Sequence, residues 1–467
     1  MKKLPKLLPF QEKGVRKLIH FNGRTLLADE QGLGKTITSL YYQVRYGTGW
    51  PIVVVCPAIA KYVWDNEARE HFGIPTVLLS RNVPPPPGQL PHGKIYVINY
   101  EILGGQKGQK YTWIDALRAL KPKLIIIDES QRIKSPDAKC TKAVYKLCKD
   151  IDKVLCLSGT PMPNGRPFEL WSTVSLLRPE VFNNRWDYCW RYCGPQKGFG
   201  GHWTFTGATN LEELNQKLNQ YCMIRRRKED VLKELPPKTT TLVPVTIEMK
   251  EYHEAEADLI RWLVKNNQKA KAKRAATALR MVKVGYLLRL AAKLKKQRVI
   301  EWIREYLSSN KDNKLIVFGV QREFLDDLHK AFITQSVLVN GSTPKQERKT
   351  RTTKFNEDSK CRLLFGNIIS AGTAWSCRST STMLFTELVW TPGDIMQAED
   401  RIRGVGRGLK GAHADIYFML ARNTIEEKLW KVLKTKEAGI SQGVDGIPSV
   451  MTGTDVYRIV EKELLDQ

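Results

Sequence analysis

The chain has 467 residues, 42% of them hydrophobic, which predicts two or three folded domains and argues against disorder by composition. Its 75 Lys and Arg outnumber its 48 Asp and Glu, and this net charge of +27 indicates a polyanionic partner, nucleic acid before an anionic membrane. No apolar run reaches the ~18 residues of a membrane span, and Met1–Lys6 lack a signal-peptide hydrophobic stretch, which argues against a membrane or secreted protein.

Two stretches of the chain alternate short β-branched runs with amphipathic segments, the pattern of parallel sheets covered by helices. The sequence therefore predicts an α/β fold with two domains of similar kind. The predicted strands are Thr25–Ala28, Ile52–Cys56, Ile95–Asn99, Leu124–Asp128 and Val154–Ser158 in the first, and Leu315–Gly319, Val337–Asn340, Arg362–Asn367, Thr382–Glu387 and Ala414–Leu420 in the second.

The first predicted strand runs into a glycine loop, Leu26–Thr36, which reads LLADEQGLGKT. Gly32 and Gly34 let successive backbone N–H groups point at phosphate oxygens, and the helix that follows adds its positive dipole end. Lys35 would then reach the β- and γ-phosphates of ATP, and the Thr36 hydroxyl would ligate Mg²⁺. The general pattern GxxxxGK[ST] requires Gly where Asp29 stands, so the match misses by one residue.

The apolar strand Leu124–Ile127 ends in two acids, Asp128 and Glu129. Next to a phosphate-binding loop, Asp128 would complete the Mg²⁺ shell, and Glu129 would orient and deprotonate the attacking water. The alternative is a pair of acids that merely ends a strand. A third block, Leu157–Asn164 (LSGTPMPN), offers hydroxyls that could hydrogen-bond to these acids and relay the state of the nucleotide.

Between the two α/β stretches, Phe168–Pro237 is rich in aromatic residues, including Trp186, Trp190 and Trp203, and predicts helices and loops packed on the first domain. The next stretch, Arg261–Ile300, carries 13 Lys and Arg and no acid. We expect it to contact nucleic-acid phosphates, with a solvated helical face as the alternative. The candidate contacts are Lys269, Lys271, Lys273 and Arg274.

Nine cysteines are scattered from Cys56 to Cys377 without a CxxC pair, which is typical of a reducing, intracellular compartment. Cys189, Cys193 and His202 are three candidate ligands where a zinc site needs four, so we interpret them as ordinary side chains. We expect a cytoplasmic, nucleoid-associated protein of a prokaryotic or phage-infected cell.

These motifs resemble those of the Swi/Snf family of superfamily-two ATPases. Leu8–Gln11 looks like the adenine-reading Q motif, with Gln11 on the base edge, and Asn99-Tyr100 resembles motif Ib. Val55–Pro57 with Trp64 and Glu67 looks like motif Ia, and Ile224–Lys238 is similar to the link between the two lobes.

The second half of the chain continues the resemblance, which covers residues 7 to 435. Lys314–Phe318 looks like motif IV, Asn340–Thr343 like the block after it, Ser370–Gly372 like motif V and Gln397–Arg401 like motif VI. The resemblance implies nucleotide contacts from Asp29, Gly372, Gln397 and Arg401, the last as an arginine finger. It also implies DNA contacts from Asn99, Tyr100 and Ser342.

The chain departs from the family at three of these motifs, and in motif V Ala374 stands where the family usually has Gly. Gln131 stands where motif II has His, and Gly404 stands where motif VI has its second arginine. Either Arg403 or Arg407 takes the place of that arginine, or the enzyme works with a single finger.

The segments Arg191–Cys193 and Thr206–Leu214 are similar to the HARP-type annealing-helicase branch of the family. That branch carries accessory domains before the ATPase, whereas the Q-like motif begins here at residue 8, so we expect a nearly bare motor.

The resemblance implies two RecA-like lobes with a helical, aromatic-rich insertion between them. The predicted parts are lobe 1 (1–167), the insertion and inter-lobe link (168–240), a basic helical segment (241–310), lobe 2 (311–435) and a tail (436–467).

The predicted function is ATP-dependent translocation on double-stranded or branched DNA, with Mg²⁺ and as a monomer. One alternative is a strand-separating DNA or RNA helicase, and another is a nucleic-acid-binding scaffold without catalysis.

Overall fold

A computed structural model describes residues 4–447 except 48, 59, 81–82, 106–109, 198–201, 233–236, 258–280, 311, 372–376 and 404–412. The chain divides into two compact units. Unit 1 consists of Met1–Lys233 and Lys436–Thr454, and unit 2 of Glu234–Thr435 and Asp455–Gln467. Unit 1 is therefore discontinuous in sequence, because the chain returns to it after unit 2.

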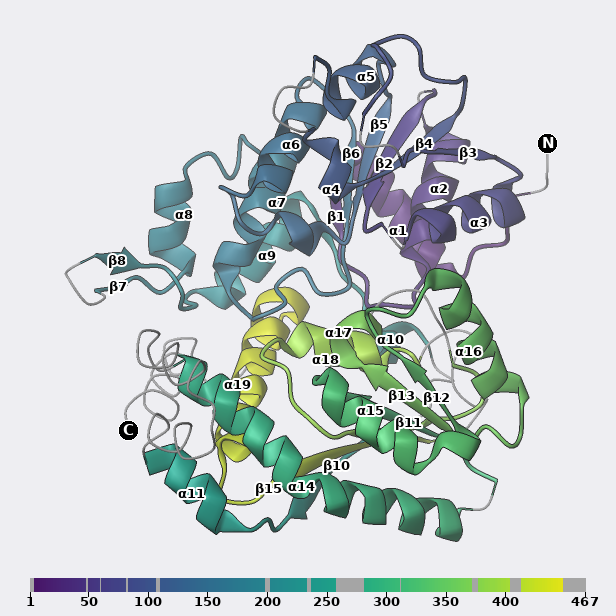
Figure 1. Cartoon of the computed structure of the whole chain (residues 1–467). Helices are drawn as coiled ribbons and strands as arrows, with labels where there is room; N and C mark the ends of the chain where they lie inside the picture. The colour runs from purple at the N-terminus through teal and green to yellow at the C-terminus, as the bar shows by residue number, and fades with distance from the viewer. Residues whose placement is uncertain are drawn as a thin grey trace. The chain divides into compact units, whose positions relative to one another are not determined.

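Unit 1 is built on a seven-stranded sheet in the order β3-β4-β2-β5-β6-β1-β9, and every pairing in it is parallel (Figure 1). Strand β2 (IVVVC) is buried at every residue, as expected where helices cover both faces of a parallel sheet. The strands are β1 (Arg24–Leu27), β2 (Ile52–Cys56), β3 (Thr76–Leu78), β4 (Ile95–Asn99), β5 (Leu124–Asp128), β6 (Val154–Leu157) and β9 (Met223–Ile224).

Helices α1 (Pro9–His20), α2 (Lys35–Tyr46) and α3 (Lys61–Phe72) cover one face of this sheet, where their apolar residues share a core with β1, β2, β4, β5 and β6. The further helices are α4 (Tyr100–Leu103), α5 (Trp113–Ala119), α6 (Lys139–Cys148), α7 (Trp171–Leu177), α8 (Arg185–Tyr192), α9 (Leu211–Tyr221) and α10 (Lys228–Val231). A small antiparallel hairpin, β7 (Gln196–Lys197) and β8 (Trp203–Thr204), follows α8. The aromatic-rich segment thus belongs to unit 1.

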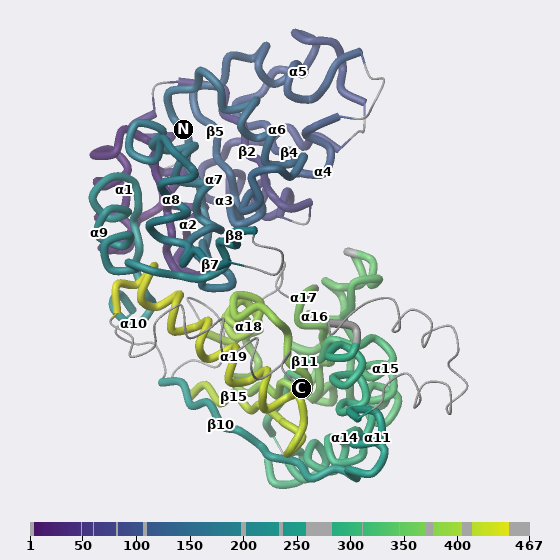
Figure 2. The backbone as a smooth tube through the Cα atoms, turned by 90° about the vertical axis from the view of Figure 1, so that its left-hand side faces the viewer, coloured from purple at the N-terminus to yellow at the C-terminus, as the bar shows by residue number. Residues whose placement is uncertain are grey.

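Unit 2 has a six-stranded, all-parallel sheet in the order β10-β15-β14-β11-β13-β12. Figure 2 shows β10 running beside β15 at its edge, where the two strands pair over eight residues. The strands are β10 (Lys238–Val245), β11 (Leu315–Gly319), β12 (Ser336–Val339), β13 (Leu363–Asn367), β14 (Thr382–Phe385) and β15 (Ala414–Ala421).

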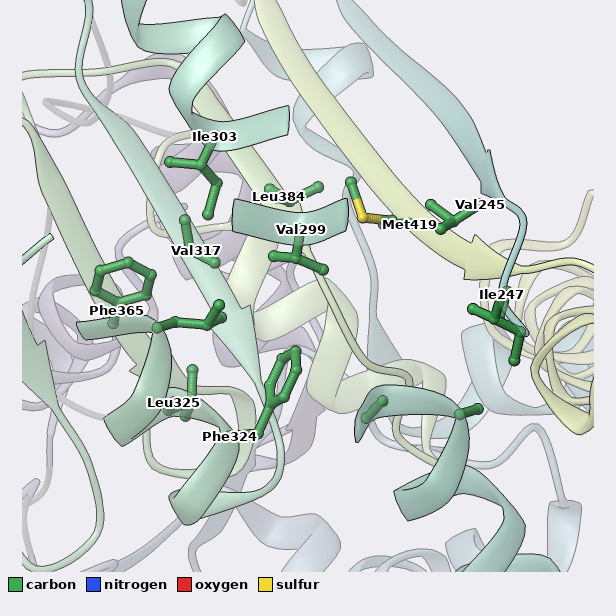
Figure 3. Packing of buried hydrophobic residues seen from close by; sticks show 14 of the residues in the cluster. Val245, Ile247, Val299, Ile303, Val317, Phe324, Leu325, Phe365, Leu384 and Met419 are labelled. Carbon is green, nitrogen blue, oxygen red and sulfur yellow. The ribbon is translucent and has the colours of Figure 1, made fainter. Parts of the chain in front are cut away.

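The long helix α14 packs on one face of this sheet, where Val299 and Ile303 lie against Val317 and Leu384 (Figure 3). The helices of unit 2 are α11 (Met249–Ala257), α14 (Met281–Ser309), α15 (Arg322–Ala331), α16 (Lys345–Glu357), α17 (Ile368–Ala371), α18 (Pro392–Glu399) and α19 (Ile425–Ile440), whose last residues belong to unit 1. Among the described residues, no helix is both long and apolar enough to cross a membrane.

The predicted α/β fold with two parallel sheets is confirmed, and each predicted strand is present within two residues of its expected bounds. The sequence analysis missed β3, β9 and β10, as well as the short hairpin strands β7 and β8. Strand β10 reads KTTTLVPV and is exposed over most of its length at the sheet edge, so it lacks the apolar run by which the central strands were found.

Candidate nucleotide-binding site

The glycine loop lies between β1 and α2, at the carboxyl edge of the unit 1 sheet. Gly32 and Gly34 have φ values of 83° and 76°, in the left-handed region that glycine adopts without strain. A Cβ at position 34 would lie 2.5 Å from Nε2 of Gln11, so the loop also needs glycine for space. Helix α2 begins at Lys35, and the N–H groups of its first turn are available for an anion.

Lys35 lies at the start of α2 and is folded back on this loop. Its ammonium donates to the carbonyl oxygens of Asp29 at 2.8 Å and Glu30 at 3.3 Å. Burial lowers the pKa of Lys35, whereas the negative charges of Glu129 and Asp29 act in the opposite direction. A cation held among carbonyls and carboxylates next to a helix N-terminus suits a phosphate.

Asp128 is the last residue of β5, and its two carboxylate oxygens have different partners. Oδ2 accepts the indole N–H of Trp64 at 2.8 Å, and Oδ1 accepts the backbone N–H of Glu129 at 2.9 Å. Burial, followed by the nearby charge of Glu129, raises the pKa of Asp128 to about 6. The hydroxyl of the buried Tyr100 donates to the Asp128 carbonyl and supports this strand end.

Glu129 has a φ of 51°, a left-handed conformation that non-glycine residues adopt at some energetic cost and that often occurs at functional sites. Its carboxylate accepts from the side-chain amides of Gln131 at 2.6 Å and Gln31 at 3.5 Å. Ser158 in turn donates to Oε1 of Gln131 at 2.7 Å and accepts the Thr160 backbone N–H at 3.1 Å. The third block is therefore connected to Glu129 through Gln131, the residue that departs from the family pattern.

Two arginines of the inter-lobe link hydrogen-bond to residues at the start of the glycine loop and stabilise it. The sequence analysis did not predict this role. Arg226 pairs with both oxygens of the fully buried Asp29 and also donates to the Phe10 carbonyl. The carboxylate of Asp29 thus faces Arg226, and its predicted contact with the nucleotide stays a prediction. The position of Asp29 just after a buried strand could have indicated this pairing, because a buried carboxylate requires a cationic partner.

Arg225 connects the glycine loop to the end of the described chain. It donates to the carbonyls of Ala28 at 2.7 Å and Gly159 at 3.0 Å, and its Nε donates to Asp445 at 2.7 Å. Only about 5% of the Arg225 side chain is exposed. This guanidinium therefore fixes the loop after β1 to the turn after β6.

The donor set fits a nucleoside triphosphate with Mg²⁺. Within the part of the chain that the structure describes, no hydrogen bond uses the Thr36 hydroxyl, and a hydroxyl with a carboxylate is a ligand pair that suits Mg²⁺. Gln11 is buried beside the loop, where its amide donates to the Leu33 carbonyl at 3.2 Å and accepts the Leu8 backbone N–H. The structure thus brings Gln11, Gly32, Gly34, Lys35, Thr36, Asp128 and Glu129 to one edge of the sheet.

The other predicted residues lie in different surroundings. The Asn99 side chain is buried between Lys61 and Glu101, and Ser342 caps its own loop by hydrogen-bonding to Asn340. In unit 2, Arg401 is 5% exposed and donates to the carbonyl of Gln397 at 3.2 Å. Arg403 is also described, whereas Gly372, Arg407, Lys269, Lys271, Lys273 and Arg274 lie outside the described residues.

Comparison with known families settles what the chain resembles. The SNF2-related domain matches residues 10–298, more than half of the chain, and the helicase conserved C-terminal domain matches residues 298–406. The chain belongs to the SNF2-related domain family. The predicted Swi/Snf resemblance is confirmed, and the chain is an SNF2-family helicase-like ATPase.

Several curated proteins are similar over nearly all of the chain. The mouse "DNA annealing helicase and endonuclease ZRANB3" is 30% identical over 465 residues, which are 96% of this chain and 42% of the mouse protein. The Xenopus laevis "SWI/SNF-related matrix-associated actin-dependent regulator of chromatin subfamily A-like protein 1" is 30% identical, over 93% of this chain and 44% of that protein. The chain thus spans less than half the length of these two relatives.

The mouse relative, whose name includes an annealing helicase, agrees with the predicted closeness to the annealing-helicase branch. Both relatives are animal proteins, so they give no support to the predicted prokaryotic or phage-infected host. Among solved structures, the "Sulfolobus solfataricus SWI2/SNF2 ATPase core in complex with dsDNA" covers 98% of this chain and is itself covered to 96%, with a TM-score of 0.43 and 21% identity.

Proposed function

We propose that this chain is a DNA-dependent ATPase that translocates on double-stranded DNA and acts on branched DNA. The observation that carries the proposal is the set of Lys35, Thr36, Asp128 and Glu129 at one sheet edge, with Glu129 linked to Ser158 through Gln131. The name of the mouse relative supports DNA as the partner, that of the frog relative refers to chromatin, and the excess of basic residues supports contact with phosphates.

Each of the site residues in unit 1 has a separate role in the proposed hydrolysis. Lys35 and the first-turn N–H groups of α2 bind the β- and γ-phosphates, while Thr36 and Asp128 hold Mg²⁺. Mg²⁺ supplies charge neutralisation at the phosphate oxygens. Glu129 orients and deprotonates the attacking water, and its strained backbone fixes where the carboxylate points. Gln11 reads the adenine edge.

Residues of unit 2 complete the proposal. Arg401 would meet the charge that develops on the γ-phosphoryl group, because its guanidinium is planar and always charged. Gly372 and Gln397 would contact the nucleotide, and either Arg403 or Arg407 would serve as a second finger, with a single-finger site as the alternative. Ser342, Asn99, Tyr100 and the basic stretch 261–300 stay our candidates for DNA contact.

A triplex-displacement assay tests translocation. A motor that tracks duplex DNA removes a third strand from a triplex in the presence of ATP, without separating the duplex itself. We expect the parent protein to release the third strand, and Lys35→Ala, which loses phosphate binding, to release none. Efficient ATP-driven separation of a tailed duplex would instead favour a strand-separating helicase, and ATP-independent DNA binding without hydrolysis would favour a scaffold.

We also propose an intracellular, reducing location and a monomer as the acting form. All nine cysteines are free thiols, and eight of them are buried, which supports the reducing location. Sedimentation of the protein on a short duplex would report whether one copy suffices.

A further inference from the structure

A wide, basic cavity lies at the other edge of the unit 1 sheet. It has a volume of about 1660 Å³, and loops and helix ends form its wall. Its lining includes Arg24, the first residue of β1, and Lys123 and Lys153, which immediately precede β5 and β6. The cavity thus lies at the amino ends of strands in the same sheet whose carboxyl edge carries the nucleotide residues. We call this cavity the basic groove.

The basic groove is separate from the nucleotide-binding residues. Strand β1 has four residues and β5 has five, so at about 3.3 Å per residue the two edges of the sheet lie about 13–17 Å apart. Arg24 begins β1 in the groove, whereas the glycine loop follows the other end of that strand. A ligand in the groove would therefore not overlap a nucleotide.

Two arginines of the groove lining are held in place by main-chain carbonyl groups. Arg24 donates to the carbonyls of Leu177 at 2.9 Å and Ile151 at 2.8 Å, and Arg118 donates to the carbonyl of Lys146 at 3.1 Å. Carbonyl oxygens are neutral acceptors and leave the guanidinium charges in place. Arg24 thus keeps its positive charge in the lining, whereas the charge of Arg118 is partly offset by Asp150.

Four lysines surround these arginines: Lys121, Lys123, Lys146 and Lys149, all of them exposed. None of the four has an ion pair in the described part of the chain. The lining contains seven basic and two acidic residues, and one of the acids, Asp150, pairs with Arg118 at 3.2 Å. A surface with this excess of solvent-facing ammonium groups attracts a polyanion.

The lining also indicates which form of nucleic acid it fits. Single strands are bound through bases stacked on aromatic rings, but Tyr145 is the one aromatic side chain in the described lining. Its hydroxyl is held by the Ser172 carbonyl and the Ser175 hydroxyl, both at 2.7 Å. Lysines contact phosphates as point charges without reading bases, which suits the outside of a duplex.

We infer that the basic groove binds the phosphate backbone of a second double-stranded DNA segment. The inference rests on the proposed function, because the first segment is the duplex along which the motor moves. A protein with two separate duplex sites holds two arms of a branched molecule at once. The groove therefore supplies a reason for a branched substrate that the nucleotide site does not provide.

A bridging assay tests the groove in the full chain. The protein is bound to a bead-tethered duplex, and capture of a second, fluorescent duplex is measured across a salt series. Lys146→Gln/Lys149→Gln should lower capture at least ~5-fold and flatten its salt dependence, since each lost phosphate contact contributes about 0.9 to the slope of log affinity against log salt. The matched control, Lys13→Gln/Lys17→Gln, removes two exposed charges from α1 and should capture like the parent.

Asp152→Asn gives a test of opposite sign. It removes an exposed acid from the lining and should increase capture of the second duplex. Equal capture by the parent and by Lys146→Gln/Lys149→Gln would overturn the inference, as would preferential capture of single-stranded DNA, duplex RNA or polyglutamate. ATP hydrolysis in the presence of one linear duplex is measured in parallel. If the parent protein shows no stimulation by this duplex, the proposed motor function is wrong. If the duplex stimulates hydrolysis but the parent does not capture a second duplex, only the inference about the basic groove is wrong.

Discussion

Each sheet places an acid at or just after the end of a central strand, and the half-buried Asp128 of unit 1 differs from the buried Glu387 of unit 2 in its surroundings. Asp128 ends β5 in unit 1, next to the second carboxylate of Glu129, and its pKa is raised to about 6. Glu387 follows β14 in unit 2, and its Oε2 accepts the backbone N–H groups of Val320 at 2.7 Å and Gln321 at 2.9 Å.

The comparison contrasts Asp128, which we propose takes part in hydrolysis, with Glu387, which holds two loops of unit 2 together. Glu387 ties the chain after β11 to the chain after β14, and its hydrogen-bonding capacity is used by protein groups. Asp128 and Glu129 also accept hydrogen bonds from protein groups, but burial and the neighbouring charge of Glu129 raise the pKa of Asp128, so holding both carboxylates charged opposes folding. The hydrogen bonds of Glu387 favour the folded state. The closeness of Asp128 and Glu129 disfavours it, as expected where a site is arranged for chemistry at the expense of stability.

The largest expected effect is a loss of ATP hydrolysis in a variant that keeps its fold. Glu129→Gln removes the general base, so kcat for ATP should fall by about 10²–10⁴-fold, while ATP binding stays near the parent value. Phosphate release and the binding of a fluorescent ATP analogue measure the two quantities. Hydrolysis at the parent rate would contradict the assignment of Glu129.

A buried lysine in unit 2 gives the corresponding test of stability. Lys295 is fully buried and donates to both carboxylate oxygens of Glu426 at 2.7 Å. Lys295→Met leaves this carboxylate buried without its cation, so the free energy of unfolding should fall by about 3–5 kcal/mol in urea.

Lys35→Met is the matched control in unit 1, because the Lys35 ammonium is held by main-chain carbonyls and by no buried ion pair. It should cost much less stability while weakening ATP binding. Equal losses of unfolding free energy in the two variants would remove the distinction between a structural and a functional lysine.

The raised pKa of Asp128 predicts a dependence of stability on pH in the metal-free protein. Because the folded chain holds the proton of Asp128 more tightly than the unfolded chain, stability should fall as pH rises from about 4 to about 6. Against Asp128→Asn, which lacks this titration, a pKa of about 6 instead of 3.8 corresponds to at most about 3 kcal/mol. Thermal unfolding across this pH range measures the difference, and parallel pH profiles for the two proteins would refute it.

The smallest expected effect concerns the structural acid. Glu387→Gln keeps one carbonyl oxygen but presents an amide to backbone donors, so unfolding free energy should fall by about 2 kcal/mol. Glu387→Asp shortens the side chain, keeps the charge and should lose less. Urea unfolding of both variants measures this order, and a loss confined to the Asp variant would show that length matters there more than charge.

Much of the fold and of the nucleotide site could be predicted from the sequence, because both depend on local patterns. A continuous apolar run such as LIIID predicts a buried parallel strand, and the acid at its end lies at the carboxyl edge of the sheet. The missed features depend on contacts between distant residues. Nothing near Trp64 indicates its bond to Asp128, and nothing near Arg225 indicates Asp445, 220 positions away.

The return of the chain to unit 1 has a practical consequence for dissecting the protein. Asn215 donates to the Val444 carbonyl at 2.9 Å, and Asp445 pairs with Arg225, so residues after α19 complete the interior of unit 1. A fragment that stops at residue 233 would lose Asp445, the nearer of the two carboxylates that pair with Arg225, and keep only the Glu30 carboxylate at 3.7 Å. Unit 1 is therefore to be produced as two peptides, or as a single chain in which a linker replaces unit 2 and joins residue 233 to residues 436–447.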